Sequence, residues 1–373
     1  MKVVTPNNLN YLWKNGIDKL FIRKANIVNN LTTTAEGKVA DARAVKTLKD
    51  DTIISIGNGY RSRYIQGYDA GGVGLTSLYS DQVSSAVKDF THIHIDKICV
   101  VVNGAYVVVN DQTLAVTGSI GNNYYVHVSS TGAVNVSTSS SESGKVCIGG
   151  FHYGRIRTGS SASATTIGIV PNSIWTLLFR PIANPAAMVY IGDGTWGDIY
   201  EFNDTSTGIS RYNVRPTVSK SWYTFNKLLR SFNKELADHA TWVAAAEGSP
   251  AGNDGDNVNA WSKTSNTESN GCGLVANAVS NYNRCDAVGN VWEWNNELIV
   301  RSDGALNWDW YSQTDEAGVK QWMYSLSDQY FTALESGGRW CDGSHASARA
   351  VALNHWPSLW GSNVGAWGVS RSV

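Results

Sequence analysis

Residues 337–373, GGRWCDGSHASARAVALNHWPSLWGSNVGAWGVSRSV, combine four tryptophans with many short polar side chains. The segment contains no lysine and no glutamate, the residues that a solvated tail normally carries. Rigid aromatic side chains supply contact area at low entropic cost, and Ser, Asn and Gly supply adaptable hydrogen bonds, as in antibody binding loops. The composition therefore predicts a contact surface.

A contact surface of this kind needs a backbone held by other residues, because a loop fixed only by its own side chains rearranges when they change. The predicted scaffold residues are Trp292, Trp294, Trp340 and Arg349, together with Gly337, Gly338, Gly365 and Gly368. The predicted contact residues are Arg339, Cys341, Asp342, Ser344, His345, Asn354, His355, Trp356, Leu359, Trp360, Ser362 and Asn363. The alternative for Trp356, Leu359 and Trp360 is burial in the hydrophobic core.

Composition narrows the class of protein. The 373 residues are 42% hydrophobic and 16% charged, which is typical of a globular chain of two or three domains. Thirty basic and 31 acidic residues give a net charge of -1, so no basic surface for nucleic acid or anionic lipid is indicated. No apolar run approaches the ~18 to 20 residues of a membrane span, and the N-terminus lacks a signal-peptide core.

Turn signals and hydrophobic patterns divide the chain into three parts. Residues 1–50 are polar, with a capping box predicted at Thr33 and Glu36 and a short amphipathic helix over 39–48. Residues 51–144 are predicted to be rich in β-strands, with one hairpin turning at Asn103-Gly104 and a second over 124–137. The run STSSSESG at 137–144 predicts a linker and hence a domain boundary.

Residues 145–373 form the third predicted domain. Apolar residues at helical spacing predict a helix within 221–236, and Asp238 is predicted to cap a second helix that ends before Gly248. Residues 249–271 are too long and too polar for an ordinary connection, so we expect an insertion loop held by a scaffold.

The stretch DAVGNVWEWNNE at 286–297 resembles the signature of the formylglycine-generating-enzyme and sulfatase-modifying family, a branch of the C-type-lectin fold. Together with GGFHYG at 149–154, SIWTLLFRP at 173–181 and the terminal block, it is similar to the variable proteins that retroelements diversify, and among them to the phage tropism determinants. Independently, residues 29–50 resemble the attachment regions of phage tail-fibre and baseplate proteins.

The resemblance implies an α+β chain in which a C-type-lectin-like domain follows a β-rich domain and a fibre-like N-terminal segment. It implies a homotrimer at the tip of a phage tail fibre that binds a host-surface protein or glycan, contacts other tail proteins and inserts into no membrane. The terminal block then supplies the diversified face. Two alternatives share this fold: a formylglycine-generating-type oxidase and a bacterial surface-display protein.

Catalytic signals are weak. Thiol oxidase chemistry needs two nearby sulfurs, and the terminal block contains only Cys341 among five cysteines without C-x-x-C spacing. The pair Cys272 and Cys285 is the one that we would test for a disulfide. No G-x-S-x-G motif is present. We therefore expect a binding protein and no catalytic residues.

Metal ligands are indicated only faintly. His92, His94 and Asp96 alternate along one predicted strand face, which is more typical of a solvated face than of a metal site. The loop at 252–259, GNDGDNVN, offers oxygen ligands without the spacing of a known calcium loop. Calcium is therefore left open, and no other cofactor is predicted.

Overall fold

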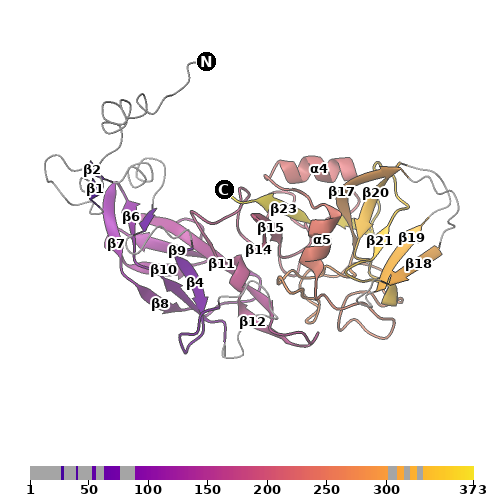
Figure 1. Ribbon diagram of the computed structural model, residues 1–373, viewed down its shortest axis with the longest axis horizontal. Helices are drawn as coiled ribbons and strands as arrows, with labels where there is room; N and C mark the ends of the chain where they lie inside the picture. Colours follow the sequence, from indigo (N-terminus) through magenta and orange to yellow (C-terminus); the bar gives the residue numbers. More distant parts are fainter. Residues whose placement is uncertain are drawn as a thin grey trace, which may run out of the picture.

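The computed structural model describes residues 63–75, 89–300, 309–314, 320–325 and 331–373, together with short strands at 27–28, 39–40 and 53–55. Two lobes lie side by side (Figure 1). The first contains the strands up to β12, and the second contains both labelled α-helices and the strands from β17 to β21. The described part of the chain is thus rich in β-strands, as predicted.

The first lobe encloses one apolar core between its sheets. β5 alternates buried Ile93 and Ile95 with partly exposed His92 and His94, the period of two that one buried face requires. Two three-stranded sheets take part. Their strands are β3 (Ile53–Ser55), β6 (Ile98–Val102) and β7 (Ala105–Val109), and β4 (Ile65–Tyr68), β5 (His92–Ile95) and β8 (Gln112–Ala115).

Both predicted hairpins are confirmed. Asn103 and Gly104 have φ values of 51° and 78°, the left-handed conformation that a two-residue turn between β6 and β7 requires. The second hairpin joins β9 (Asn122–Ser129) to β10 (Val134–Ser137).

The predicted boundary at residue 144 is wrong, because one sheet continues across it. β11 (Lys145–Arg157) pairs with β9 on the side opposite β10, and β12 (Thr165–Ile169) and β13 (Trp175–Thr176) pair with β11. The serine-rich run is a turn within this sheet, held by Glu142, which accepts hydrogen bonds from Lys145 at 2.6 Å and from Asn135. A polar run of this composition suits a long turn as well as a linker.

In the N-terminal segment, β1 (Ile27–Val28) pairs in parallel with β2 (Val39–Ala40). Val39 and Ala40 therefore extend as a strand, and a helix that starts at residue 39 is wrong. The strand pairing satisfies their backbone groups in place of a helical turn. The predicted capping box at 33–36 and the remainder of the helix lie outside the described residues.

A four-stranded sheet joins the lobes. Its order is β14-β15-β23-β16, so the last strand of the chain lies between strands from earlier parts of the sequence. A buried cluster that includes Ile156, Val170 and Tyr200 packs between the lobes. The strands are β14 (Met188–Gly192), β15 (Thr195–Asp198), β16 (Glu235–Leu236) and β23 (Gly368–Arg371).

The second lobe contains the two predicted helices, which are confirmed. α4 (Trp222–Arg230) is capped by Ser221, and α5 (His239–Ala246) is capped by Asp238, whose carboxylate accepts the Thr241 N–H at 2.7 Å. Neither has the length or apolar content to cross a membrane, and the described residues contain no other candidate span. Residues 249–271 form no regular helix or strand, as expected for an insertion loop.

A six-stranded sheet completes the second lobe, in the order β18-β19-β21-β20-β17-β22. The C-terminal segment contributes β21 and β22 to this sheet. Its loops therefore begin and end beside strands that come earlier in the sequence. The strands are β17 (Trp292–Val300), β18 (Asp309–Thr314), β19 (Lys320–Ser325), β20 (Phe331–Ser336), β21 (Val351–Ala352) and β22 (Val364–Ala366).

Candidate functional site

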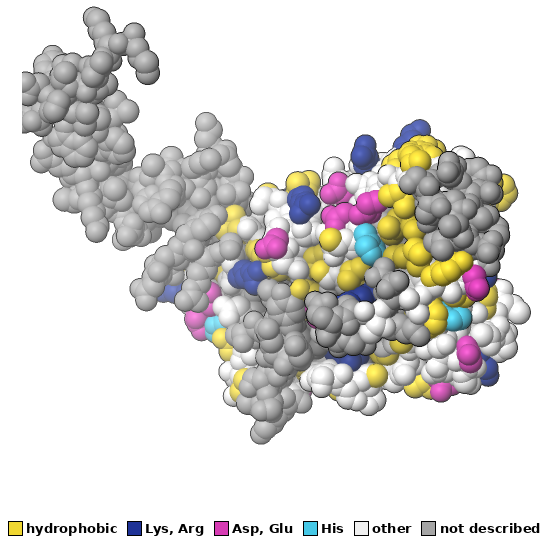
Figure 2. All heavy atoms as spheres, turned by 45° about the vertical axis from the view of Figure 1, so that its right-hand side comes forward, with side chains coloured by type: hydrophobic (Ala, Val, Ile, Leu, Met, Phe, Trp, Pro, Cys, Tyr) yellow, Lys and Arg dark blue, Asp and Glu magenta, His cyan; other side chains and the backbone are white. Residues whose placement is uncertain are grey.

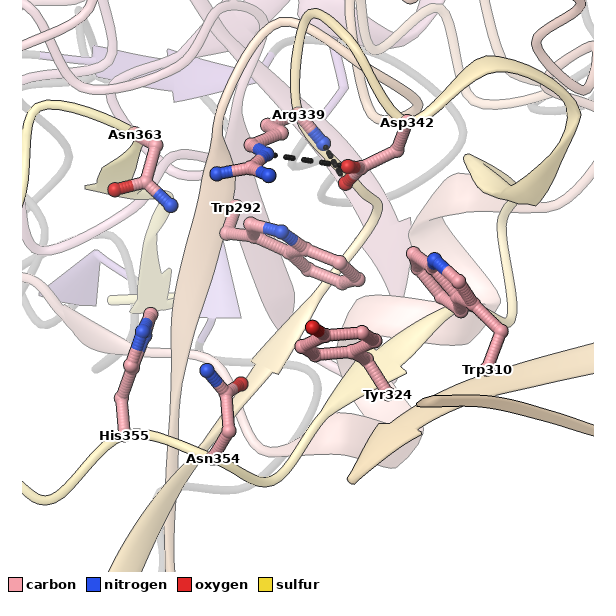
Figure 3. Close-up of a pocket in the computed structure, with 8 residues that line it drawn as sticks. All are labelled: Trp292, Trp310, Tyr324, Arg339, Asp342, Asn354, His355 and Asn363. Atoms are coloured by element: carbon pink, nitrogen blue, oxygen red, sulfur yellow. Dashed lines mark hydrogen bonds and ion pairs between the residues drawn. The ribbon is translucent and has the colours of Figure 1, made fainter. Parts of the chain in front are cut away.

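A pocket of about 300 Å³ opens on the second lobe, and the C-terminal segment supplies most of its wall (Figure 3). Five of the eight lining residues belong to the predicted contact set. The lining residues are Trp292, Trp310, Tyr324, Arg339, Asp342, Asn354, His355 and Asn363. Residues separated by up to 71 positions in the sequence thus share one small cavity.

Strand pairing positions the first pair of side chains. β22 runs parallel to β17, and the Trp292 N–H donates to the Asn363 carbonyl at 2.9 Å. This bond fixes Asn363 beside the Trp292 ring. Figure 3 shows the Asn363 amide turned toward the cavity next to that ring.

Asn354 and His355 follow β21, which lies between β19 and β20. The Leu353 N–H donates to the Tyr324 carbonyl at 3.1 Å, and the Ala333 N–H donates to the His355 carbonyl at 3.0 Å. The chain is therefore held on both sides where these two side chains enter the pocket.

His355 pairs with a buried carboxylate. Its Nδ1 lies 2.8 Å from Oε1 of Glu335, a side chain with no exposed surface. Burial alone would lower the pKa of His355, but the attraction and hydrogen bond of Glu335 outweigh it, and the pKa is raised above the ordinary value. A charged imidazolium on Glu335 is favoured.

Arg339 and Asp342 form a small turn after β20. The Asp342 carboxylate accepts from the Arg339 backbone N–H at 2.9 Å and from its Nε at 3.1 Å. Burial raises the pKa of Asp342, while these donors oppose the shift. The two charges are paired, so neither adds a net charge to the pocket.

The turn begins at the predicted glycine pair. Gly337 and Gly338 have φ values of 98° and 91°, and a Cβ atom on Gly338 would meet the Cβ atom of Ala346 at 2.7 Å. Trp340, which is buried, donates its backbone N–H to the Asn290 carbonyl at 3.0 Å. The glycines and Trp340 therefore hold this loop.

The aromatic side of the pocket was not predicted from the sequence. Trp310 on β18 stacks on Trp292 with ring centroids 6.1 Å apart, and Tyr324 on β19 lies 5.2 Å from Trp310. His345 lies against Trp310 at 4.5 Å and against Trp322 at 4.4 Å. The signal was present, because Trp322 and Tyr324 are two residues apart and so share one strand face.

Trp294 and Glu293, which follow Trp292 on β17, are buried in the core. Trp294 has no exposed surface, and Glu293 forms a buried ion pair with Arg284 and accepts from the Trp242 indole N–H. The Arg284 guanidinium also lies 4.0 Å from the Trp367 ring centroid. The segment predicted to be structural is therefore part of the core, and Trp292 belongs both to the core and to the pocket.

The other predicted contact residues do not line this pocket. Trp356 is 46% exposed and Trp360 is 70% exposed, so the core alternative is wrong for these two. Their loop lies on α4, since the Trp222 N–H donates to the Pro357 carbonyl at 3.1 Å. Figure 2 shows hydrophobic side chains gathered on this end of the molecule. Leu359 and Cys341 are half-buried, and Ser344 and Ser362 are exposed.

Two predicted environments are corrected. Arg349, predicted as a scaffold residue, lies in a turn, is only half-buried and lines a second cavity beside Ser347. Asn354, predicted as a contact residue, is only 8% exposed. Alternation predicts burial only within strands, and β21 is two residues long.

The side chains considered above as metal ligands contact other groups of the protein. The Nε2 atom of His94 lies 3.6 Å from Asp96 and 3.5 Å from Asp111, whereas His92 contacts Thr91. In the loop at 252–259, the Asn253 Oδ1 accepts from two backbone N–H groups within the loop. These oxygen atoms stabilise turns.

A third cluster is buried between the lobes. Glu201, Cys272 and Asp286 bring potential ligand atoms within 4.8 Å of one another, and burial raises the pKa of Asp286 to about 7. Glu201 accepts from the Cys272 thiol at 3.3 Å and from the Asn290 amide. Cys272 and Cys285 are free thiols, so the pair tested for a disulfide is not bridged.

No protein-family model matches the sequence, and no curated protein matches it significantly. Solved structures do match. The chain is similar to the Major Tropism Determinant U1 variant with a TM-score of 0.60 and 21% identity, over 82% of this chain and 90% of that one. The P3c variant gives 0.60 and 23% over the same shares, and the M1 variant gives 0.59 and 22% over 82% and 89%. The chain therefore has the fold of these proteins.

Proposed function

We propose that the protein binds a host-surface molecule through the C-terminal face, as the receptor-binding protein at the tip of a phage tail fibre. In this proposal the second lobe is a C-type-lectin-like domain, and a retroelement diversifies residues of the segment 337–373. The protein acts as a homotrimer attached to other tail proteins through its N-terminal segment.

One observation carries the proposal. Five predicted contact residues, scattered over 25 positions of sequence, converge in one pocket on a backbone that strands and glycines fix from outside. Side chains on such a framework can change while the loop keeps its path. The fold shared with the Major Tropism Determinant variants over most of both chains supports the same reading.

The oxidase alternative needs two thiols close enough to form a disulfide. All five cysteines are free, and burial raises the pKa of Cys341, which disfavours the reactive thiolate. We expect Cys341→Ser to keep the melting temperature of the parent protein. An oxidase activity toward cysteine-containing peptides that disappears in this variant would establish the alternative instead.

Cell binding tests the proposal directly. The labelled full-length protein is titrated on a panel of bacterial strains, and we expect saturable binding to a subset of them. Replacing Asn363 with Ala should weaken it, because that amide faces the pocket. Tyr106→Ala is the control, since Tyr106 is 53% exposed on β7 of the other lobe. Equal binding to every strain, or equal loss in both variants, would contradict the proposal.

A second test lies in the DNA beside the gene. Diversification requires a template, so we expect a near-copy of the last 37 codons next to a reverse-transcriptase gene. A flanking region that contains neither leaves receptor binding in place and removes the retroelement from the proposal.

A further inference from the structure

The pocket has one polar group that the protein itself leaves without a partner. Asn354 is 8% exposed, and its Oδ1 has no hydrogen-bond partner among the described residues. A buried amide in this state destabilises the fold unless another molecule supplies the missing bond. Figure 3 shows the side chain directed into the cavity between His355 and Tyr324.

Other hydrogen-bonding groups surround the same space. In Figure 3 the Arg339 guanidinium and the Asn363 amide are turned toward the cavity beside the Trp292 ring. An aromatic residue inserted here would pack against the aromatic wall but would leave these polar groups without partners. A ligand with one apolar face and several hydroxyl groups satisfies both parts of the wall.

The charges argue for a neutral ligand. Arg339 is paired with Asp342 at 3.1 Å, and His355 is paired with Glu335 at 2.8 Å. An anionic ligand would have to compete with carboxylates that are already in place, and a cationic ligand would meet Arg339 and His355.

We infer that this pocket binds a neutral pyranose ring, the terminal sugar of a surface glycan, with its apolar face against the aromatic wall of Trp292, Trp310 and Tyr324 and its hydroxyl groups on Arg339, Asn354 and Asn363. The inference rests on the proposed function and names the ligand class of its site. Trp292, Trp310 and Tyr324 lie outside the diversified segment and fix the class of ligand. The residues of the segment then select which hydroxyl pattern is bound. A protein receptor is the competing occupant.

Binding of simple glycosides tests the ligand class. The full-length protein is titrated with methyl pyranosides of glucose, galactose and mannose, and with N-acetylneuraminic acid as the anionic probe. Saturation-transfer NMR and tryptophan fluorescence report binding. We expect at least one neutral glycoside to bind and to quench the fluorescence. Binding of the anionic probe alone, or of none of the four, overturns the inference.

Asn354→Leu tests the residue at the centre of the argument. The substitution keeps the size of the side chain and removes the unpartnered amide, so we expect an unchanged or higher melting temperature together with glycoside binding weakened by about tenfold or more. Asn110→Leu is the matched control on an exposed turn of the first lobe. A folded Asn354→Leu protein with undiminished glycoside binding overturns the inference. If the variant does not fold, the glycoside titration of the parent protein decides whether the inference stands.

Treated cells separate this inference from the proposed function. On strains that bind the protein, periodate cleaves the vicinal diols of sugars and a protease removes surface proteins. Loss of binding after periodate supports a glycan. Binding that survives periodate and disappears after protease overturns the sugar inference and leaves receptor binding intact, whereas binding to no strain contradicts the proposed function itself.

Discussion

His355 shows that one side chain of the C-terminal segment 337–373 has a structural role. Glu335 beneath it has no exposed surface, and an uncompensated buried carboxylate is costly. His355 supplies the compensating charge from a position that the sequence assigns to the contact surface. A variant with another residue here must stabilise Glu335 in another way.

The raised pKa of His355 predicts a pH-dependent stability. A histidine whose pKa is higher in the folded state stabilises the protein fully below its unfolded pKa and loses that contribution as the pH rises through the folded value. The melting temperature of His355→Gln should therefore lie furthest below that of the parent near pH 5 and approach it near about pH 9. A difference that stays constant or widens with rising pH would show that the ion pair does not form.

The same substitution at two tryptophans compares a core residue with a surface residue. Trp294 has no exposed surface and Trp360 is 70% exposed. Trp294→Ala should lower the free energy of unfolding by about 3 to 5 kcal/mol, and Trp360→Ala should change it by no more than about 0.5 kcal/mol. Chemical denaturation of both variants measures the difference. The reverse order would mean that the two sides of the lobe are assigned wrongly.

At the scale of elements, the loop after β20 depends on glycine. Gly338 has a φ of 91°, and an added Cβ atom would meet that of Ala346 at 2.7 Å. Gly338→Ala should therefore destabilise the protein by roughly 1 to 3 kcal/mol and weaken cell binding, because Arg339 follows directly. Gly255→Ala is the control, with a nearest contact of 3.4 Å and no positive φ. Thermal melts that show equal effects would contradict the strained turn.

Local sequence patterns predicted both hairpins and the helices α4 and α5 correctly. The features that these patterns missed depend on pairing between residues far apart in the sequence. The Asn103-Gly104 turn and the Asp238 cap act between neighbouring residues, so the sequence alone indicates them. The sheet that crosses residue 144 depends on pairing between β9 and β11, for which no local signal exists. Likewise, the Trp310 side of the pocket and the burial of Asn354 follow from strand order in the six-stranded sheet.

At the scale of the whole molecule, both ends of the C-terminal segment are fixed. β20 lies before it in the six-stranded sheet, and β23, close to its end, lies in the sheet that joins the lobes. The loops between these strands thus have no free end. This arrangement stabilises a binding face on which many side chains can differ, because the chain path is determined by backbone pairing on both sides.

In the proposed function, a binding face at a fibre tip gains from being repeated. Three copies that engage one cell surface raise avidity by roughly 100-fold or more without any new contact. We therefore predict that light scattering gives three times the 40.5 kDa of the chain at micromolar concentration. A mass equal to that of the single chain would exclude the trimer.

The distribution of substitutions among natural copies of this gene tests the central claim most directly. A diversified binding face predicts that substitutions concentrate at the contact positions of residues 337–373, above all at Arg339, Asn354 and Asn363. The codons of Gly338, Trp340 and Trp294 should stay fixed, because the loop path depends on them. Substitutions spread evenly over the 373 codons would contradict the account.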